Sequence, residues 1–315
     1  MRQCPGLQRR TAMRPMLILM FMLIATPALA TDGVLEINQT CAENTGCFVG
    51  DGALFPVTIG AAGSYRLTSN LAVDENTSAI IVDADHVTVD LNGFAILGPA
   101  VCSGTPTICS STGSGRGVRM DFGQPWAVNT TVLNGTIQGM GDRGIQLGNH
   151  ALVRGVRVSN GQDGINANSG SSFIDNIASW NGRIGIVGAG FEGCVIKGNA
   201  ANENGLDGII GAADCVISGN TASGNAQRGI SVNTDATLVG NTVNDNAGIG
   251  IEIRGGALRG NTVIDNGSFG LDGEPEVGYG ENVFEGNNGG NANAQVTGGG
   301  IEIGTNLCGT NTTCP

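Results

Sequence analysis

Residues 219–230 read GNTASGNAQRGI, and the same arrangement returns as GNTVNDNAGIGI at 240–251 and as GNTVIDNGSFGL at 260–271. Each copy holds a Gly-Asn pair, a second Asn five residues after the first, and a Gly followed by a branched apolar residue. A period near 21 residues that contains three short β-like runs and no helical pattern is typical of one coil of a parallel β-helix. The sequence therefore predicts an all-β solenoid.

The repeat extends well beyond these three copies. Successive Gly-apolar pairs lie 20, 21, 23, 21, 21 and 20 residues apart. They are Gly144-Ile145, Gly164-Ile165, Gly185-Ile186, Gly208-Ile209, Gly229-Ile230, Gly250-Ile251 and Gly270-Leu271. Because stacked strands lie ~4.8 Å apart, residues one period apart are predicted to be neighbours. Before about residue 160 the pattern does not fix the register.

Two columns of asparagine keep the same period. They contain Asn199, Asn220, Asn241, Asn261 and Asn282, and, five residues on, Asn204, Asn225, Asn246, Asn266 and Asn287. Asn tolerates the left-handed backbone of a sharp corner, and its amide can bond to the Asn of the coils on either side. We expect the asparagines to occupy corners in this way, with Gly permitting the other corners.

The apolar columns alternate with polar positions, so they are predicted to point inward and form the core. These columns include Ile196, Ile217, Leu238 and Leu258, and Ile230 and Val232 with Ile251 and Ile253.

This repeat resembles that of the right-handed parallel β-helix proteins of the pectin-lyase-like superfamily, particularly the type shared by NosD-like and alginate-epimerase-like proteins. The resemblance rests on Gly198-Asn199 through Ile209 with its copies, and on Val87-Thr88-Val89-Asp90-Leu91-Asn92-Gly93-Phe94. It implies a single-stranded right-handed parallel β-helix over residues 56–305. Such coils serve lyases, hydrolases, epimerases and noncatalytic surface proteins, so the resemblance specifies architecture and not chemistry.

Residues 1–30 have the plan of a secretory signal. Four arginines precede an apolar run at 16–25, and an A-x-A-like cleavage site follows at 27–30. The apolar run is too short to span a bilayer, which takes roughly 20 residues. We therefore expect a secreted or periplasmic protein without membrane insertion.

The ends of a solenoid expose apolar surface and unpaired strand edges unless they are capped. We assign residues 31–55 to an N-terminal cap and residues 306–315 to a C-terminal cap or tail. Residues 98–116 are rich in Gly, Ser, Thr and Pro, which predicts a loop inserted between coils.

Eight of the nine cysteines lie outside the signal segment and fall into four close pairs, an arrangement that indicates disulfides in an exported protein. The pairs are Cys41/Cys47, Cys102/Cys109, Cys194/Cys215 and Cys308/Cys314. Cys194 and Cys215 each precede an Asn of the first column by five residues, so they are predicted to stack in adjacent coils. They would form either a disulfide or two buried thiols.

The charge balance disfavours nucleic acid as a partner. The chain has 27 acidic and 15 basic residues, for a net charge of −12, whereas phosphate binding requires clustered Lys and Arg. Zinc is also disfavoured, because no C-x-x-C spacing occurs and His86 and His150 are the only histidines.

The outer face of the Gly-Ile strand holds the strongest candidate site. Its column reads Gln146, Asn166, Val187, Ile210, Ser231, Glu252 and Asp272. A second Gly-Ile-Glu-Ile run predicts that Glu302 continues it. Stacked carboxylates repel unless a cation, solvent or a proton relieves them. A solvated acidic edge is the favoured interpretation, and calcium bound by Glu252, Asp272 and Glu302 is the alternative and the candidate cofactor.

Glu252 and Asp272 are also the candidate catalytic residues, because glycosidases use two carboxyl groups separated by about one or two coil spacings. In the column before the repeat Gly, Arg143 next to Asp163 and Asp207 next to Arg228 are expected to form neutralised pairs between coils. The resemblance to lyases implies the alternative that an arginine acts there as a base.

The resemblance also implies catalytic signatures that this sequence lacks. It has no Gly-His-Gly, Asp-Asp, Arg-Ile-Lys or Asp-Pro-His run, which removes the polygalacturonase and alginate-epimerase patterns. We therefore predict an exported monomer that interacts with an extracellular or periplasmic polysaccharide, without evident catalysis. The alternatives are a polysaccharide lyase or glycoside hydrolase acting at the acidic column, and a surface or adhesion scaffold.

Overall fold

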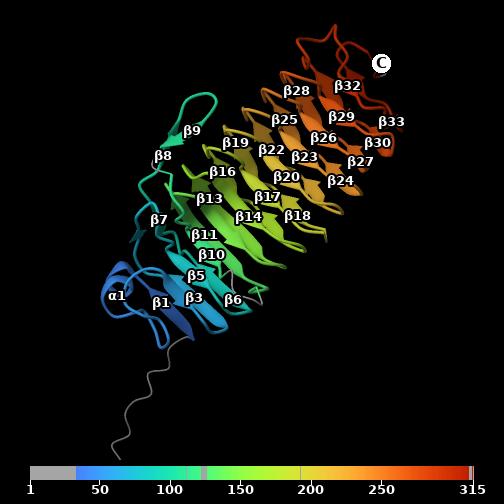
Figure 1. The fold of residues 1–315 in the computed structure, drawn as a ribbon. Coiled ribbons are helices and arrows are strands. Elements are labelled where there is room, and N and C mark those ends of the chain that lie inside the picture. Colours follow the sequence, from blue (N-terminus) through green and yellow to red (C-terminus); the bar gives the residue numbers. More distant parts are fainter. Residues whose placement is uncertain (1–32, 111, 122–125, 192, 312–313, 315) are drawn as a thin grey trace, which may run out of the picture. The chain divides into compact units, whose positions relative to one another are not determined.

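The structure is a computed structural model that describes residues 33–110, 112–121, 126–191, 193–311 and 314. Within the compact unit that begins at Gly33, short strands wind into stacked coils (Figure 1). The signal sequence predicted for residues 1–30 lies outside the described residues. No helix among the described residues is long and apolar enough to cross a membrane.

One strand of each coil joins an eleven-stranded parallel sheet, which we call sheet B. Its strands are β2 (Val57–Ile59), β5 (Ile80–Val82), β10 (Val118–Met120), β12 (Arg143–Leu147), β14 (Asp163–Ala167), β17 (Ile186–Gly188), β20 (Ile209–Gly211), β23 (Ile230–Val232), β26 (Ile251–Ile253), β29 (Leu271–Gly273) and β32 (Val296–Thr297).

The other strands form a 21-stranded sheet, sheet A, built from two ladders that the long strands β11 and β13 join. The first ladder holds β1 (Val34–Ile37), β3 (Gly63–Leu67), β6 (Val87–Asp90), β11 (Thr131–Gln138), β13 (Leu152–Ser159), β15 (Ser172–Ile174), β18 (Val195–Lys197), β21 (Val216–Ser218), β24 (Ala236–Val239), β27 (Gly256–Arg259), β30 (Val277–Gly280) and β33 (Ile301–Glu302). The second adds β4 (Leu71–Ala72), β7 (Ala95–Leu97), β16 (Ile177–Ser179), β19 (Ala200–Asn202), β22 (Thr221–Ser223), β25 (Thr242–Asn244), β28 (Thr262–Ile264), β31 (Val283–Glu285) and β34 (Leu307–Cys308).

The register confirms the predicted parallel β-solenoid. Ile209 pairs with Ile230, and Ile230 pairs with Ile251, in parallel strands one repeat apart. The predicted apolar columns face inward, since Ile217, Leu238 and Ile251 are fully buried. Alternation along each strand therefore separates a continuous apolar core from an outer polar surface.

Both asparagine columns form buried hydrogen-bonded ladders, as predicted. Asn220 donates through Nδ2 (3.0 Å) and through its backbone N–H (3.0 Å) to Oδ1 of Asn241. Its Nδ2 also donates to the carbonyl oxygen of Ile196 at 2.8 Å. These bonds satisfy polar groups that would be costly to bury unpaired. The ladders comprise Asn176, Asn199, Asn220, Asn241, Asn261, Asn282 and Asn306, and Asn181, Asn204, Asn225, Asn246, Asn266, Asn287 and Gln295.

The expectation that these asparagines adopt the left-handed backbone is wrong. The preceding residue adopts it, as in Gly219 (φ 63°), Gly240 (φ 64°) and Asp245 (φ 56°). The asparagine after this bend turns its amide inward, where it bonds to the neighbouring coils. The repeat glycine has a different role, because a Cβ on Gly250 would lie 2.4 Å from Cγ1 of Val263 and 2.7 Å from the carbonyl oxygen of Gly270.

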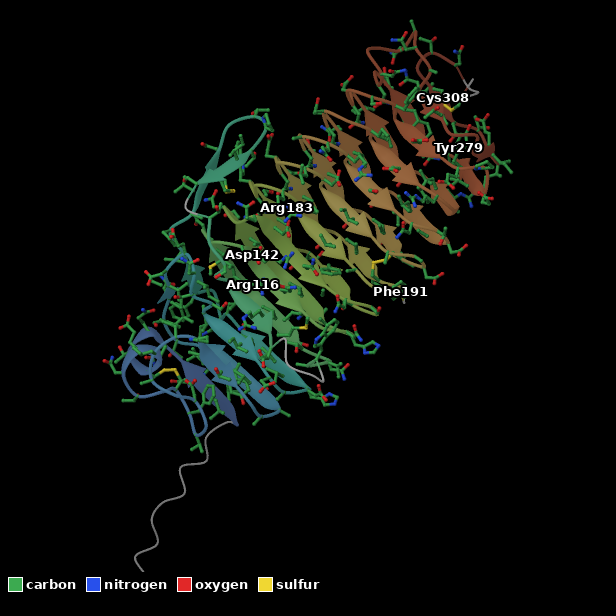
Figure 2. The ribbon with its side chains drawn as sticks, in the orientation of Figure 1. Arg116, Asp142, Arg183, Phe191, Tyr279 and Cys308 are labelled. Atoms are coloured by element: carbon green, nitrogen blue, oxygen red, sulfur yellow. A yellow bond between two sulfur atoms is a disulfide. The ribbon has the colours of Figure 1, made fainter. Side chains whose placement is uncertain are left out.

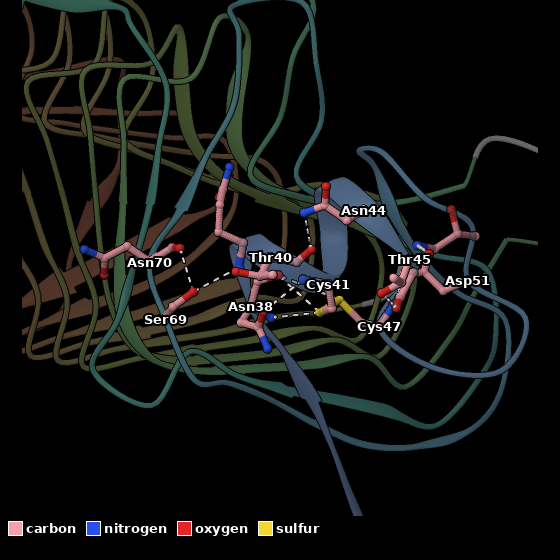
Figure 3. The surroundings of a disulfide bond; sticks show 12 residues. Asn38, Thr40, Cys41, Asn44, Thr45, Cys47, Asp51, Ser69 and Asn70 are labelled. Atoms are coloured by element: carbon pink, nitrogen blue, oxygen red, sulfur yellow. Dashed lines mark hydrogen bonds between the residues drawn. A yellow bond between two sulfur atoms is a disulfide. The ribbon is translucent and has the colours of Figure 1, made fainter.

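The N-terminal segment contributes both a strand and a short helix. Helix α1 (Gln39–Asn44) begins after Asn38, whose Oδ1 accepts a hydrogen bond from the N–H of Cys41 at 2.9 Å. The Cys41–Cys47 disulfide joins α1 to the loop that follows it (Figure 3). Strand β1 already pairs in parallel with β3, so strand pairing starts before the predicted boundary at residue 56.

In the C-terminal segment, strand pairing continues past residue 305. In β34, Cys308 pairs with Phe284 of β31. Cys314, the described residue nearest to the C-terminus, is half-buried and packs against the core. The predicted disulfide joins Cys308 to Cys314, whose Cα atoms lie 5.2 Å apart. Cys314 is therefore bound to the last paired strand of sheet A.

The other three predicted cysteine pairs are also disulfides in the structure. Cys194 and Cys215 join adjacent coils with their Cα atoms 4.4 Å apart, so the alternative of two stacked thiols is excluded. Cys102 and Cys109 join β8 (Val101–Ser103) to β9 (Ile108–Ser110), an antiparallel hairpin within the segment predicted as an inserted loop.

Candidate functional site

The outer column of sheet B has the order that the sequence predicts. Gln146 pairs with Asn166, Ser231 pairs with Glu252, and Glu252 pairs with Asp272. Val187 and Ile210 continue the column between Asn166 and Ser231. Glu252 and Asp272 lie on directly adjacent strands, which are ~4.8 Å apart in a parallel sheet. Over its last three positions, the column therefore presents one polar side chain on each successive coil, from Ser231 to Asp272.

The predicted continuation of this column to Glu302 is wrong. Asp272 pairs instead with Thr297 of β32, and Glu302 pairs with Tyr279 in sheet A. Gln295 follows Asn287 by only eight residues and takes the last position of the asparagine ladder. The residues directly after Gln295 form β32, the sheet B strand next to β29. The carboxylate of Glu302 accepts a hydrogen bond from Asn306 at 2.9 Å.

The predicted calcium site therefore lacks its third carboxylate. Among the residues that the structure describes, no group of three or more His, Cys, Asp or Glu side chains is placed to hold a metal ion. Calcium normally takes six to eight oxygen ligands, which Glu252 and Asp272 alone do not supply.

Ion pairs run beside the column, at the start of the sheet B strands. Nε of Arg143 donates to Oδ2 of Asp163 at 3.0 Å, as predicted for neighbouring coils. Arg116 pairs with Asp142 at 2.7 Å, and Arg183 lies 3.6 Å from Asp163. Figure 2 shows Arg116, Asp142 and Arg183 following one another along the same side of the coils.

Arg228 links this row to the acidic column. It makes two hydrogen bonds to the buried carboxylate of Asp207, at 2.9 and 3.0 Å, as predicted, and a further one to Glu252. The hydrogen bond to Asp207 raises the pKa of the Arg228 guanidinium. The bond to Glu252 was not predicted from the sequence, because the two residues lie in separate columns and only the length of the arginine side chain brings them together.

Asp272 stands beyond the end of this ion-pair network. Burial and, to a smaller degree, the Glu252 carboxylate raise the pKa of Asp272 above its ordinary value. A Cβ on Gly298 would lie 2.5 Å from Oδ1 of Asp272, so the backbone of the last coil packs closely against this carboxylate. Two adjacent carboxylates thus have different environments: Glu252 is paired with a cation, and Asp272 is partly shielded from water.

The raised pKa predicts that ionised Asp272 destabilises the fold. The folded state holds this proton more tightly than the unfolded state, so stability falls as pH rises from 3.8 through the folded-state pKa. Because water screens part of the interaction, Asp272→Asn is expected to raise the free energy of unfolding by only ~0.5 kcal/mol at pH 7 and by nothing at pH 3. Denaturation of both proteins at the two pH values measures this difference, and a loss of stability at pH 7 would contradict it.

Comparison with known proteins places the chain in a family. Residues 114–299, more than half of the chain, match the family model described as "Periplasmic copper-binding protein (NosD)". The chain belongs to the NosD family. No curated protein matches its sequence.

Solved structures that share the fold of this NosD-family chain include two epimerases. The A-module of the mannuronan C-5 epimerase AlgE4 from Azotobacter vinelandii is 15% identical, with a TM-score of 0.58, over 90% of this chain and 89% of that one. The periplasmic alginate epimerase AlgG is 15% identical, with a TM-score of 0.58, over 86% and 83%. The predicted resemblance to pectin-lyase-like β-helices is therefore confirmed at the level of architecture.

The side chains described in this NosD-family protein do not fit a copper site. Copper is held by imidazole, thiolate and thioether ligands. The eight described cysteines are all in disulfides, and Met120 and Met140 are buried in the core. His86 and His150 precede β6 and β13, with β11 lying between those two strands. A Cβ on Gly170 would lie 2.4 Å from the His150 ring, so this imidazole packs against the following coil.

Proposed function

We propose that this protein binds an extended neutral polysaccharide along the outer face of sheet B. The observation that supports the proposal most is the row Ser231, Glu252, Asp272 and Thr297, which offers a hydroxyl or carboxylate on each of four successive strands. A ladder with one polar group every ~4.8 Å suits a polymer of sugar units better than a compact ligand. The epimerase fold of the structural neighbours is consistent with a glycan partner.

The charge distribution favours a neutral glycan over an acidic one. The net charge is −12, and Arg228, the cation that contacts Glu252, is also bound to Asp207. A polyanion would meet uncompensated negative charge at Asp272. Aromatic residues make up only 4% of the chain, so few stacking platforms are present and the affinity is expected to be modest.

The proposed location is the periplasm or the extracellular space. Four disulfides are typical of an oxidising compartment, and the description of the matching family names the periplasm. Residues 1–30 act as the export signal in this proposal, residues 31–55 and 306–315 cap the solenoid, and the mature protein works as a monomer.

Retention on immobilised glycans tests the proposal. The protein is passed over neutral and acidic polysaccharides, with Glu252→Gln and Asp272→Asn as variants and Asp214→Asn as the control, because Asp214 is exposed in the turn between β20 and β21 and lies outside the column. We expect retention by a neutral polymer, about fivefold weaker binding in each sheet B variant, since each loses a charged acceptor, and no change in the control. Retention by no glycan would contradict the proposal and favour a scaffold role.

A second candidate function is glycan cleavage by Glu252 and Asp272, favoured by the contrast between their environments. Asp272, with its raised pKa, is suited to donate a proton to a leaving oxygen, and Glu252, held by Arg228, is suited to remain ionised. Incubation with the retained neutral glycan would then release reducing ends by hydrolysis, and both substitutions would abolish this release. Retention without products leaves binding as the function.

A further inference from the structure

The disulfide-braced hairpin of β8 and β9 lies along a corner of later coils, beside those that hold β16 and β19 (Figure 1). The buried hydroxyl of Thr107 donates to the carbonyl oxygen of Glu203 at 2.7 Å, across 96 residues of sequence. A Cβ on Gly182 would lie 2.7 Å from Sγ of Cys109, and one on Gly205 would lie 2.4 Å from the carbonyl oxygen of Thr107. The hairpin is therefore held closely against the solenoid.

A groove of about 680 Å³ opens where the tip of this hairpin, Thr105 and Pro106, faces the coil corners. Its volume lies within the range of small-molecule sites, ~300–1,000 Å³. The polar side chains lining it include Glu203, Gln227 and Asp245, and none of its described lining residues is basic. It is thus an acidic groove with one rigid wall.

The two carboxylates belong to one corner column, in which Gly224 separates them. The backbone N–H of Glu203 donates to the carbonyl oxygen of Ser223 in the next coil. The N–H of Gly224 donates in the same way to the carbonyl oxygen of Asn244. A Cβ on Gly224 would lie 2.7 Å from Oε1 of Glu203, so this carboxylate extends over the glycine toward the coil of Asp245. Neither carboxylate forms an ion pair with a described residue. Two negative charges therefore face one cavity without a cation from the surrounding protein.

We propose that this groove binds a protonated primary amine on a compact, hydroxyl-bearing body, such as an amino sugar unit of a glycan. Charge complementarity identifies the amine, because an ammonium group can donate to both Glu203 and Asp245. The amide of Gln227 is available to the hydroxyl groups, and Pro106 and Ala226 offer apolar contact to the body of the ligand. The groove is separate from the outer face of sheet B, so this proposal does not depend on the proposed function.

Calorimetric titration of the full chain with three probes tests the proposal at neutral pH. The probes are a fully deacetylated glucosamine oligomer, its N-acetylated counterpart of equal length, and spermidine. Glu203→Gln and Asp245→Asn remove the charges with little change of shape. Asp265→Asn is the matched control, because Asp265 directly follows β28 as Asp245 follows β25, and it adopts the same left-handed backbone (φ 54°) without lining the groove.

We expect the glucosamine oligomer to bind and its N-acetylated counterpart to bind at least tenfold more weakly, since acetylation removes the positive charge. Each groove variant is expected to weaken oligomer binding by about tenfold, while Asp265→Asn leaves it unchanged. Spermidine that binds as tightly as the oligomer, with the same dependence on Glu203 and Asp245, would identify a free polyamine as the source of the amine. Equal binding of the acetylated oligomer, unchanged affinity in both groove variants or no binding of any amine would overturn the proposal.

Discussion

Asn225→Ala is expected to lower the free energy of unfolding by about 4 kcal/mol, because it removes the centre of a buried ladder. Oδ1 of Asn225 accepts from the backbone N–H (3.0 Å) and Nδ2 (2.9 Å) of Asn204. Its Nδ2 donates to Oδ1 of Asn246 at 2.8 Å and to the carbonyl oxygen of Ala201 at 2.9 Å. The substitution leaves several of these buried groups unpaired, and each costs roughly 1–3 kcal/mol.

Urea denaturation followed by circular dichroism measures this effect. Asn233→Ala is the control, because Asn233 is exposed and lies outside both ladders, and its effect is expected to be under about 0.5 kcal/mol. An Asn225→Ala protein that unfolds with the midpoint and slope of the parent would show that the ladder adds nothing to stability.

Removal of the disulfide between adjacent coils is expected to have the second largest effect. The double variant Cys194→Ala, Cys215→Ala opens a loop with a sequence separation of 21, which corresponds to about 3 kcal/mol of chain entropy in the unfolded state. Both cysteines are buried in the core, so the substitution also removes apolar contacts. Thermal unfolding of the double variant against the parent measures the loss.

The hairpin disulfide provides the comparison for this experiment. Cys102 and Cys109 lie in an insertion whose strands pair only with each other, so Cys102→Ala, Cys109→Ala is expected to change the unfolding of the solenoid by less than about 1 kcal/mol. Equal losses in the two double variants would contradict the assignment of the stabilising role to the disulfide between coils.

The coil register was predictable because one local pattern recurs under nearly constant spacing. Asn220, Asn241 and Asn261 become neighbours whenever their coils have equal length, and the same argument places Glu252 beside Asp272. Glu302 lies outside this column, because the local Gly-Ile-Glu-Ile pattern is retained but the preceding turn has a different length. A motif predicts position in a solenoid only while the period is kept.

Other features depend on contacts that no local pattern encodes. The hairpin joins Thr107 to Glu203 through a bond between segments 96 residues apart, so the sequence predicted an inserted loop but not its position. The left-handed bend falls one residue before the ladder asparagines from Asn176 to Asn287 because the amide has to turn into the core to bond between coils. The polarity of Asn suggested a corner, and packing determined which residue forms the bend.

The dependence of affinity on glycan length tests the central functional claim most directly. If an extended neutral glycan lies along sheet B, the dissociation constant should fall with each added sugar unit until the chain spans the four strands from Ser231 to Thr297, and then level off. A dissociation constant that is the same from disaccharide to long oligomer, or the absence of binding at every length, would contradict this account.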